Sequence, residues 1–140
     1  MNGKNLMEML EFLNSFETFI SLIESANLDE MLSEECPFTL FAPNDGAFAA
    51  LPKGMVGELL SEPSRLQIVI QNHILEGKFF EEDLLTLESI QTLSGRDLTI
   101  YLLGGEATIN DARLVTSDIK ATNGIIHIVD TVLLPDKEFE

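Results

Sequence analysis

Residues 39–52, TLFAPNDGAFAALP, decide the fold more directly than any other stretch of this chain. Their apolar start predicts a short buried strand, which stops at Pro43 because proline has no backbone N–H to donate to a strand ladder. Asn44 then offers a side-chain oxygen that can accept a hydrogen bond from the first turn of a following helix. Phe48 and Leu51 give that helix a buried face. The stretch therefore predicts a strand that turns directly into a helix.

Residues 123–135, NGIIHIVDTVLLP, form the second informative stretch. Asn123 and Gly124 predict a tight turn, because glycine accepts backbone angles that other residues resist. A long apolar strand follows and stops at Pro135. Successive side chains of a strand point to opposite faces, and both faces are largely apolar here. Such a strand is typical of the centre of a sheet that is covered on both sides.

Residues 72–79, NHILEGKF, lie between those two stretches. Pro63 suits the first turn of a helix, where its missing N–H costs nothing. The apolar spacing that follows continues this helix and places His73 on its buried face. Gly77 marks the expected end of the helix.

The first part of the chain is also predicted to be helical. Apolar residues recur there at helical spacing from Leu6 to Leu32. Asn14 precedes Glu17 by three positions, which predicts a cap that divides a short first helix from a longer second one. From Ile90 onwards the apolar period shifts towards two. Helices first and mostly antiparallel strands afterwards indicate an α+β fold.

The three stretches, in this order, resemble the signature segments of the fasciclin domain, an extracellular adhesion module. The resemblance spans residues 39–135, and the helical region before it also fits the family. It implies a fasciclin-type β-wedge or sandwich of mostly antiparallel strands flanked by an N-terminal α-helical bundle. The expected α+β plan agrees with this architecture.

Length and charge restrict the possibilities further. A chain of 140 residues predicts a single domain over residues 1–140. It has 24 acidic and 8 basic residues and a net charge of −16, which argues against nucleic acid as a partner and against docking on an anionic membrane. No apolar run approaches 18 residues, so no transmembrane segment is expected. The acidic residues are expected to form a solvated surface, and weak calcium binding remains an alternative although no calcium-loop spacing is present.

The compartment is inferred mainly from the resemblance. Cys36 is the only cysteine, so an intramolecular disulfide is impossible. The first residues lack the apolar segment and cleavage site of a signal peptide. Either the native protein is intracellular, or this is an excised domain of an extracellular or cell-surface protein. The resemblance favours the excised domain.

Signals for catalysis are weak in this sequence. No Gly-x-Ser-x-Gly motif and no cysteine-nucleophile motif around Cys36 occurs. No His-x-x-x-His or Cys-x-x-Cys motif suggests a zinc site. We therefore expect no catalytic residues, no cofactor, no metal and no enzymatic activity.

Two pairs of residues are the candidate partner contacts: Asn44 with Asp45, and Asn72 with His73. The family often carries tyrosine where this chain has Asn72, which weakens any transfer of the integrin contact proposed for that segment in animal members. An alternative is that His73 only tethers its helix to a neighbouring loop. Likewise, Asn44 is explained by capping, and Asp45 by the positive end of the helix dipole.

The remaining residues of interest are expected to be structural. They are Gly77, Asn123, Gly124, His127 and Asp130. His127 is expected in the core or at a sheet edge with a hydrogen-bonded partner. Asp130 points to the opposite face of the same strand, so these two side chains should not form an acid–base pair.

The leading hypothesis is a non-enzymatic adhesion or recognition module at a cell surface or in an extracellular matrix. Its partner would be a protein or a glycan, and the adhesion role is implied by the resemblance alone. One alternative is a structural domain that associates with copies of itself. A second alternative is a hydrolase that uses His73 or His127.

Overall fold

The computed structural model describes residues 4–33, 37–51, 54–95, 97–103, 106–109 and 112–133. The helical half of the fold comes first. Its elements are α1 (Leu6–Leu13), α2 (Glu17–Ser25), the 3₁₀ helix η1 (Met31–Ser33), α3 (Asp45–Ala49), α4 (Met55–Leu60) and α5 (Pro63–Gln71). The remaining elements are β1 (Phe38–Pro43), β2 (Ile74–Glu76), α6 (Glu81–Leu84), β3 (Ser89–Gln91), β4 (Asp97–Leu103), β5 (Glu106–Ile109), β6 (Ala112–Ala121) and β7 (Gly124–Val129).

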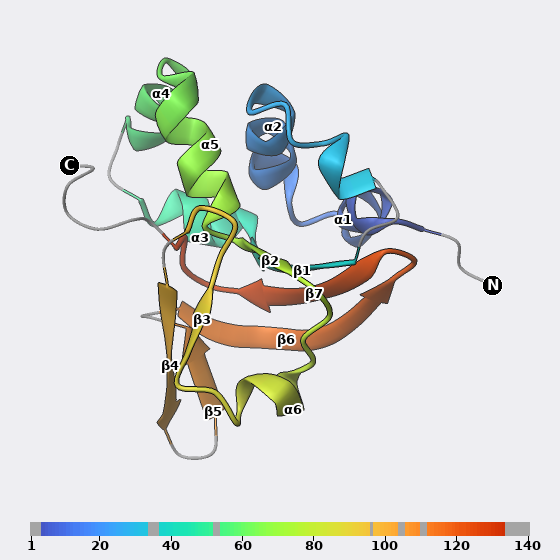
Figure 1. Cartoon of the computed structure of the whole chain (residues 1–140). Coiled ribbons are helices and arrows are strands. Elements are labelled where there is room, and N and C mark those ends of the chain that lie inside the picture. The colour runs from blue at the N-terminus through green and yellow to red at the C-terminus, as the bar shows by residue number, and fades with distance from the viewer. Residues whose placement is uncertain are drawn as a thin grey trace.

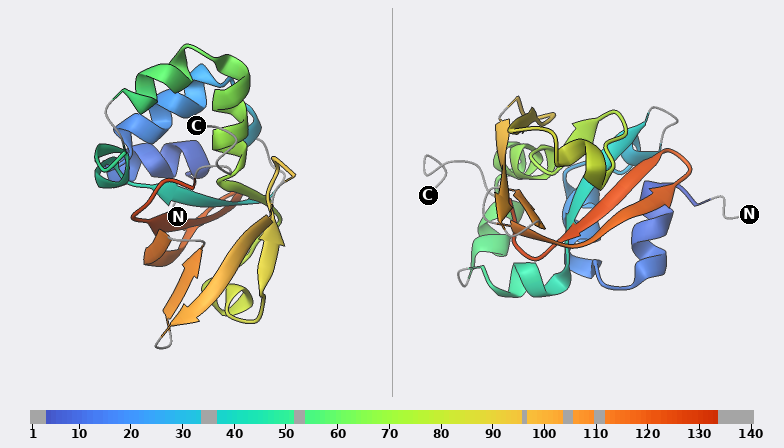
Figure 2. Two further views of the ribbon diagram at one scale, coloured as in Figure 1. Left: turned by 90° about the vertical axis from the view of Figure 1, so that its left-hand side faces the viewer. Right: turned by 90° about the horizontal axis from the view of Figure 1, so that it is seen from below.

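The helices gather on one side of the molecule. Figure 1 shows α1, α2, α4 and α5 above the strands, with α6 alone at the opposite end. Figure 2 shows the same separation from two other directions. This arrangement confirms the expected α+β class.

The seven strands form one sheet in the order β2-β1-β7-β6-β5-β4-β3. All neighbouring strands are antiparallel except β1 and β7, which run parallel. The sheet is curled, and at its seam the N–H of Leu93, two residues beyond β3, donates to the carbonyl of Ile74 in β2 at 3.0 Å. Strand β7 lies between β1 and β6, so the prediction of a central last strand is confirmed.

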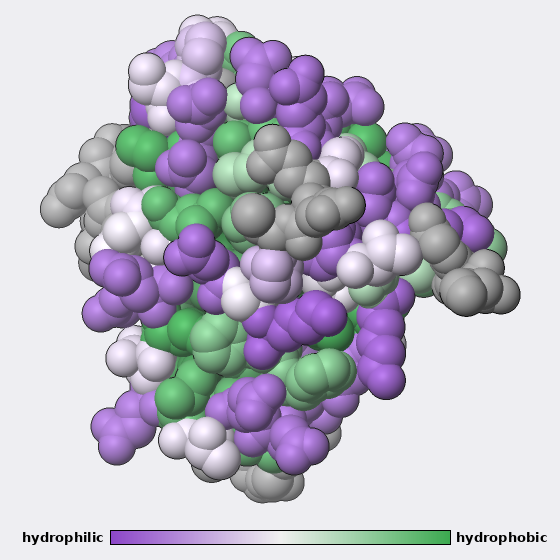
Figure 3. Space-filling model, turned by 45° about the vertical axis from the view of Figure 1, so that its right-hand side comes forward, coloured by the Kyte–Doolittle hydropathy of each residue, from purple (hydrophilic) through white to green (hydrophobic). Residues whose placement is uncertain are grey.

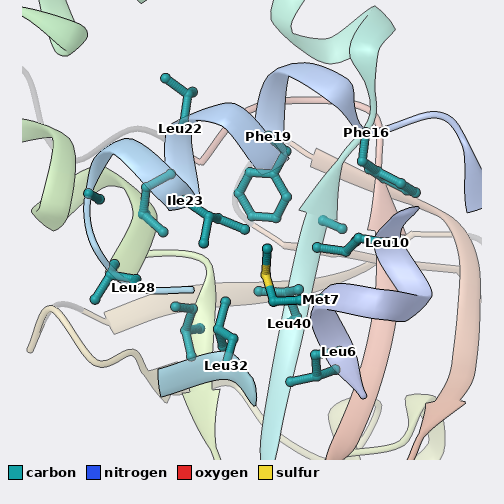
Figure 4. Packing of buried hydrophobic residues seen from close by; sticks show 14 of the residues in the cluster. Leu6, Met7, Leu10, Phe16, Phe19, Leu22, Ile23, Leu28, Leu32 and Leu40 are labelled. Atoms are coloured by element: carbon teal, nitrogen blue, oxygen red, sulfur yellow. The ribbon is translucent and has the colours of Figure 1, made fainter. Parts of the chain in front are cut away.

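Two hydrophobic cores lie on the two faces of β1 and β7. The larger core lies under the helices and includes Phe19 and Leu40. Figure 4 shows this core, with side chains from α1, α2, η1 and β1 converging. The smaller core lies inside the curled sheet and includes Phe41 and Val129. Because Leu40 and Phe41 are neighbours, strand β1 is buried on both of its faces.

The cap between the first two helices differs from the prediction. Asn14 lies in the left-handed region, at φ 61°, and ends α1. It does not begin α2, whose N-cap is Phe16 and makes no capping hydrogen bond through its side chain. Helix α1 instead begins with a capping box, in which Asn5 and Glu8 each accept the other's backbone N–H.

Helix α5 also ends earlier than predicted. It stops at Gln71 with Asn72 as its C-cap, and Ile74–Glu76 then pairs with β1 as strand β2. Gly77 therefore ends a strand and not a helix, and its φ of +104° explains why glycine stands there. Residues 74–76 form a strand despite their helical spacing, because they pair with the edge of the buried strand β1 that would otherwise lack backbone partners.

Candidate functional site

Asn44 occupies the corner between β1 and α3. Its side-chain Oδ1 accepts a hydrogen bond from the Ala47 N–H at 2.9 Å, and its backbone is extended, as a helix N-cap requires. The predicted capping role of Asn44 is confirmed. The residue is half-buried, so part of its side chain faces solvent.

Asp45 links the same corner to helix α2. Its Oδ1 accepts a hydrogen bond from the Thr18 N–H at 3.1 Å, and its own N–H donates to the Ser15 carbonyl at 2.9 Å. Thr18 is the second residue of α2, the helix whose N-cap Phe16 offers no side-chain acceptor. Asp45 therefore supplies the missing cap from 27 positions away. Sequence reasoning missed this role, since no local motif connects the two segments.

His73 is buried and has both ring nitrogens bonded to the backbone. The Leu133 N–H lies 2.8 Å from Nε2, and the Val69 carbonyl lies 2.8 Å from Nδ1. An amide N–H can only donate, so Nε2 must be the acceptor and Nδ1 must carry the proton. The ring is therefore neutral, and the edge of Phe19 packs against it. Burial lowers the pKa of His73 to about 4, although the Val69 carbonyl acts in the opposite direction.

Asn72 forms hydrogen bonds with two other segments at the seam of the sheet. Its Nδ2 donates to the Leu133 carbonyl at 2.6 Å. Its Oδ1 accepts from the hydroxyls of Thr92, at 3.5 Å, and Ser94, at 3.3 Å. Asn72 and His73 together therefore hold the Leu133 backbone by both its N–H and its carbonyl.

The burial of these two residues bears on the predicted partner contact. Asn72 is 2% exposed and His73 is 0% exposed. The alternative role for His73, tethering its segment to a neighbouring one, is confirmed by the bond to Leu133. The partner contact itself stays a prediction, and in this structure neither side chain reaches the surface to make it.

His127 is a second buried histidine, and each of its two ring nitrogens forms a hydrogen bond. Its Nδ1 accepts from the Asp118 N–H at 3.2 Å, and its Nε2 lies 2.7 Å from the Phe79 carbonyl, to which it must donate. Burial lowers the pKa of His127, opposed by the Phe79 carbonyl and by the charges of Asp118 and Glu81. The expectation of a core histidine with a hydrogen-bonded partner is confirmed.

The segment that His127 holds runs from β2 into α6. The Thr39 hydroxyl donates to the Gly77 carbonyl at 2.7 Å and accepts from the Phe79 N–H at 2.8 Å. The Asp118 carboxylate accepts from the Glu81 N–H at 2.8 Å. Asp118 lies in an irregular part of β6 with φ 60°. Three residues of the sheet, Thr39, Asp118 and His127, thus fix the connection between β2 and α6.

Asp130 does not contact His127. Its Oδ1 accepts from the Arg113 N–H at 3.0 Å and from the Thr131 hydroxyl at 3.0 Å. The prediction that the two side chains form no acid–base pair is confirmed. Asp130 instead secures the end of β7 to the start of β6.

Asn123 and Gly124 connect β7 to the helices. Asn123 accepts from the Leu6 N–H at 2.9 Å and donates to the Leu32 carbonyl at 2.8 Å. Gly124 is not among the described residues with positive φ, so the explanation from turn angles is wrong. Glycine is required there because an added Cβ would lie 2.0 Å from the Phe38 carbonyl oxygen.

The described groups offer little for catalysis or metal binding. In the part of the chain that the structure describes, every buried side-chain N or O atom has a hydrogen-bond partner. Among those residues, no three His, Cys, Asp or Glu side chains gather as metal ligands would. The acidic run 81–83 forms the first turn of α6, whereas Cys36 and residues 136–140 lie outside the described residues. None of the described helices combines the length and apolar character that a membrane crossing requires.

Comparison with known proteins gives a family. The fasciclin domain family matches residues 14–135. Protein sll1483 of Synechocystis is 36% identical over 136 residues, which are 96% of this chain and 75% of that protein. Transforming growth factor-beta-induced protein ig-h3 of Sus scrofa is 32% identical over 133 residues, 94% of this chain and 20% of that protein. Cell surface glycolipoprotein MPB83 of Mycobacterium bovis is 28% identical over 116 residues, 83% of this chain and 49% of that protein.

A solved structure supports the fold independently. The chain is similar to a FAS1 domain pair from the insect cell adhesion molecule fasciclin I, with a TM-score of 0.80 and 16% identity. The likeness covers 98% of this chain and 53% of that one. At 16% identity, this likeness supports the fold alone. With the family match over most of its length, the chain belongs to the fasciclin domain family.

Proposed function

We propose that residues 1–140 form a single fasciclin domain that acts as a non-enzymatic adhesion or recognition module, outside the cell or at its surface. The observation that carries this proposal is the family match over residues 14–135. Similar proteins include a cell-surface glycolipoprotein of Mycobacterium bovis. The domain would be one excised from a longer protein, and its partner would be a protein or a glycan.

The state of the two histidines supports a non-enzymatic role. A general base must reach the proton that it removes. Both nitrogens of His73 and of His127 are bonded to backbone groups, and both residues are buried. A hydrolase that uses either ring would first have to break one of these hydrogen bonds to free a ring nitrogen.

The proposed contact surface is the corner formed by Asn44, Asp45 and the exposed end of α3. Hydrogen bonds to Ala47 and Thr18 hold both side chains in place, and each is only half-buried. A preorganised corner loses little conformational freedom on binding. The Asn72–His73 segment would act indirectly, by positioning neighbouring segments.

Surface charge limits the class of partner. The chain carries a net charge of −16, and hydrophilic side chains cover much of the face in Figure 3, with apolar residues in smaller groups between them. Such a surface repels polyanions and tolerates neutral glycans and neutral or basic protein surfaces. Nucleic acid is therefore not proposed as a partner.

The contact surface can be tested with beads coated with the domain and mixed with intact source cells. Ala49→Arg combined with Ala50→Arg changes only exposed positions at the end of α3. We expect this variant to reduce bead retention at least fivefold while its urea unfolding curve stays unchanged. Thr116→Arg, at an exposed position of β6, is the matched control and should retain wild-type binding. Equal retention by all three proteins would refute this surface.

Two further measurements separate the alternatives. Protease treatment of intact source cells should remove the domain if it is exposed outside the cell, and full protection until lysis would contradict the proposed location. Sedimentation of the pure domain over a range of concentrations should show a monomer. Concentration-dependent association would instead favour a structural domain whose partner is a second copy.

A further inference from the structure

Two adjacent residues, Asn72 and His73, form hydrogen bonds with Leu133 at the end of the described chain. Leu133 donates its N–H to His73 Nε2 at 2.8 Å and accepts at its carbonyl from Asn72 Nδ2 at 2.6 Å. Both bonds span about sixty positions of sequence, and both anchoring residues lie at the end of α5. One of the two bonds that hold Leu133 therefore needs an unprotonated Nε2 on His73.

The segment held in this way closes both hydrophobic cores. Val132 is buried in the core under the helices, and Leu133 is buried in the core inside the sheet. Releasing the segment would expose both side chains to water. The released and bound states are therefore distinct, and the bonds to Leu133 bias the equilibrium between them.

We propose that His73 is an acid-operated latch, which holds Val132 and Leu133 on the domain when neutral and releases them when the ring gains a second proton. In the bound state, Nε2 has a lone pair directed at the Leu133 N–H. A proton added to Nε2 would place two donors face to face. The hydrogen bond would be lost, and the Leu133 N–H would be left without its acceptor.

Among the described neighbours of the His73 ring, only the Val69 carbonyl favours a positive charge, and burial outweighs it. The neighbours of the ring are the Phe19 ring from α2, the Val69 carbonyl from α5 and the Leu133 N–H. None of these groups is ionisable. His127 differs, because the carboxylates of Asp118 and Glu81 face it and favour its charged form. Water that enters when the segment opens would therefore stabilise the imidazolium of His73 better than the buried site does.

The size of the effect follows from proton linkage. The pKa of His73 is lowered to about 4 while the ring is buried, whereas a hydrated imidazole titrates near 6.5. The released state thus binds the proton more tightly, and it becomes more populated as the pH falls between these values. Linkage predicts an increase in its population of about 20-fold from pH 7 to pH 5 and about 100-fold from pH 7 to pH 4.

Amide hydrogen exchange of the full chain, measured by NMR at pH 7, 6 and 5, tests the latch. The exchange rates are expressed as protection factors, which correct for the pH dependence of the intrinsic exchange rate of an unfolded chain. The protection of the Leu133 amide should fall about 20-fold between pH 7 and pH 5. The Phe38 amide, which donates to the Asn123 carbonyl at the start of β1, is the internal reference, and Leu133 should be less protected than Phe38 at every pH because the segment opens without the rest of the fold. Equal protection of both amides at each pH would indicate global unfolding and overturn the latch, and so would constant protection of Leu133.

His73→Gln supplies the variant test, because its amide oxygen can accept a hydrogen bond but does not titrate. In this variant the Leu133 amide should be less protected at pH 7, and its protection should not change between pH 7 and pH 5. His127→Gln is the matched control and should keep the wild-type fall at Leu133. A persistent fall in His73→Gln would overturn the latch. If that variant does not fold, the wild-type comparison of Leu133 with Phe38 still decides.

Discussion

Replacing Gly124 with alanine should disrupt the junction between β1 and β7. The added Cβ would lie 2.0 Å from the Phe38 carbonyl oxygen, 3.0 Å from the Phe38 carbonyl carbon and 3.2 Å from Leu6 Cδ1. A carbon atom needs more than about 3 Å from an oxygen, so one strand must move by at least roughly 1 Å. The contact is with backbone, which cannot rotate away as a side chain could.

The cost of this movement can be assembled from the contacts it breaks. Phe38 and Gly124 are the first partners of the parallel ladder, and the Phe38 N–H donates to the Asn123 carbonyl at 3.1 Å. Leaving such buried groups unpaired costs about 1–3 kcal/mol. Overpacking of a close contact costs a further 1–3 kcal/mol, approximately. We expect a loss of about 3–5 kcal/mol in the free energy of unfolding, a large part of the roughly 5–15 kcal/mol of a typical domain.

Urea unfolding followed by circular dichroism measures this loss. Gly57→Ala is the matched control, since Gly57 lies in α4 and an added Cβ there meets nothing within 4 Å. That variant should be more stable than wild type by about 0.5–1 kcal/mol, because alanine favours helix over glycine. A loss below about 1 kcal/mol for Gly124→Ala would refute the close-approach explanation.

Three further changes test the buried polar contacts by urea unfolding. Asp45→Ala should cost about 1–2 kcal/mol, as removal of a helix cap does, whereas Asp45→Asn keeps an acceptor for the Thr18 N–H and should cost less. Equal losses would show that the hydrogen bond is not the cause. Asn123→Ala leaves the backbone groups of its two partners unpaired and should cost about 2–4 kcal/mol, and a loss under about 1 kcal/mol would contradict its role as a junction. Because the pKa of His73 is lowered in the folded state, the stability that its neutral ring contributes is present above pH 6.5 and is lost as the pH falls towards 4. Wild type should therefore lose about 2 kcal/mol more than His73→Gln between pH 7 and pH 5. Equal losses in the two proteins would contradict this linkage.

Local patterns predicted those features whose cause is local. Asn44 was expected to cap α3 because a cap and its N–H donor are three residues apart, and the structure contains that bond. The alternation along the last strand predicted that His127 and Asp130 form no acid–base pair, which is also confirmed. The prediction of secondary structure was wrong where pairing with a strand distant in sequence outweighs the local preference for a helix. The chain after Asn72 continues a helical spacing, yet it forms β2 because β1 offers it backbone partners.

The candidate site shows the same division. His73 could be identified from its place in the chain, but not its neutral tautomer, because its deciding partner Leu133 lies 60 positions away. Asp45 was noticed for a helix-dipole effect in α3, while its hydrogen bond is to the N-terminus of α2. The burial of Asn72 could not be anticipated, since a polar residue at a helix end is usually exposed.

The sequence by itself determined the α+β class, the strand-to-helix turn at Asn44, the buried last strand and, through three short segments, the resemblance to the fasciclin family. These features depend on periods of two or about four residues and on local turn chemistry, which a linear chain displays directly. Only the tertiary structure decided that Asp45 caps a different helix, that Gly124 is required by a neighbouring carbonyl, and that two histidines are buried and neutral. The physical reason is that each of these outcomes depends on contacts between atoms tens of residues apart in the sequence. A local sequence pattern does not show such long-range contacts.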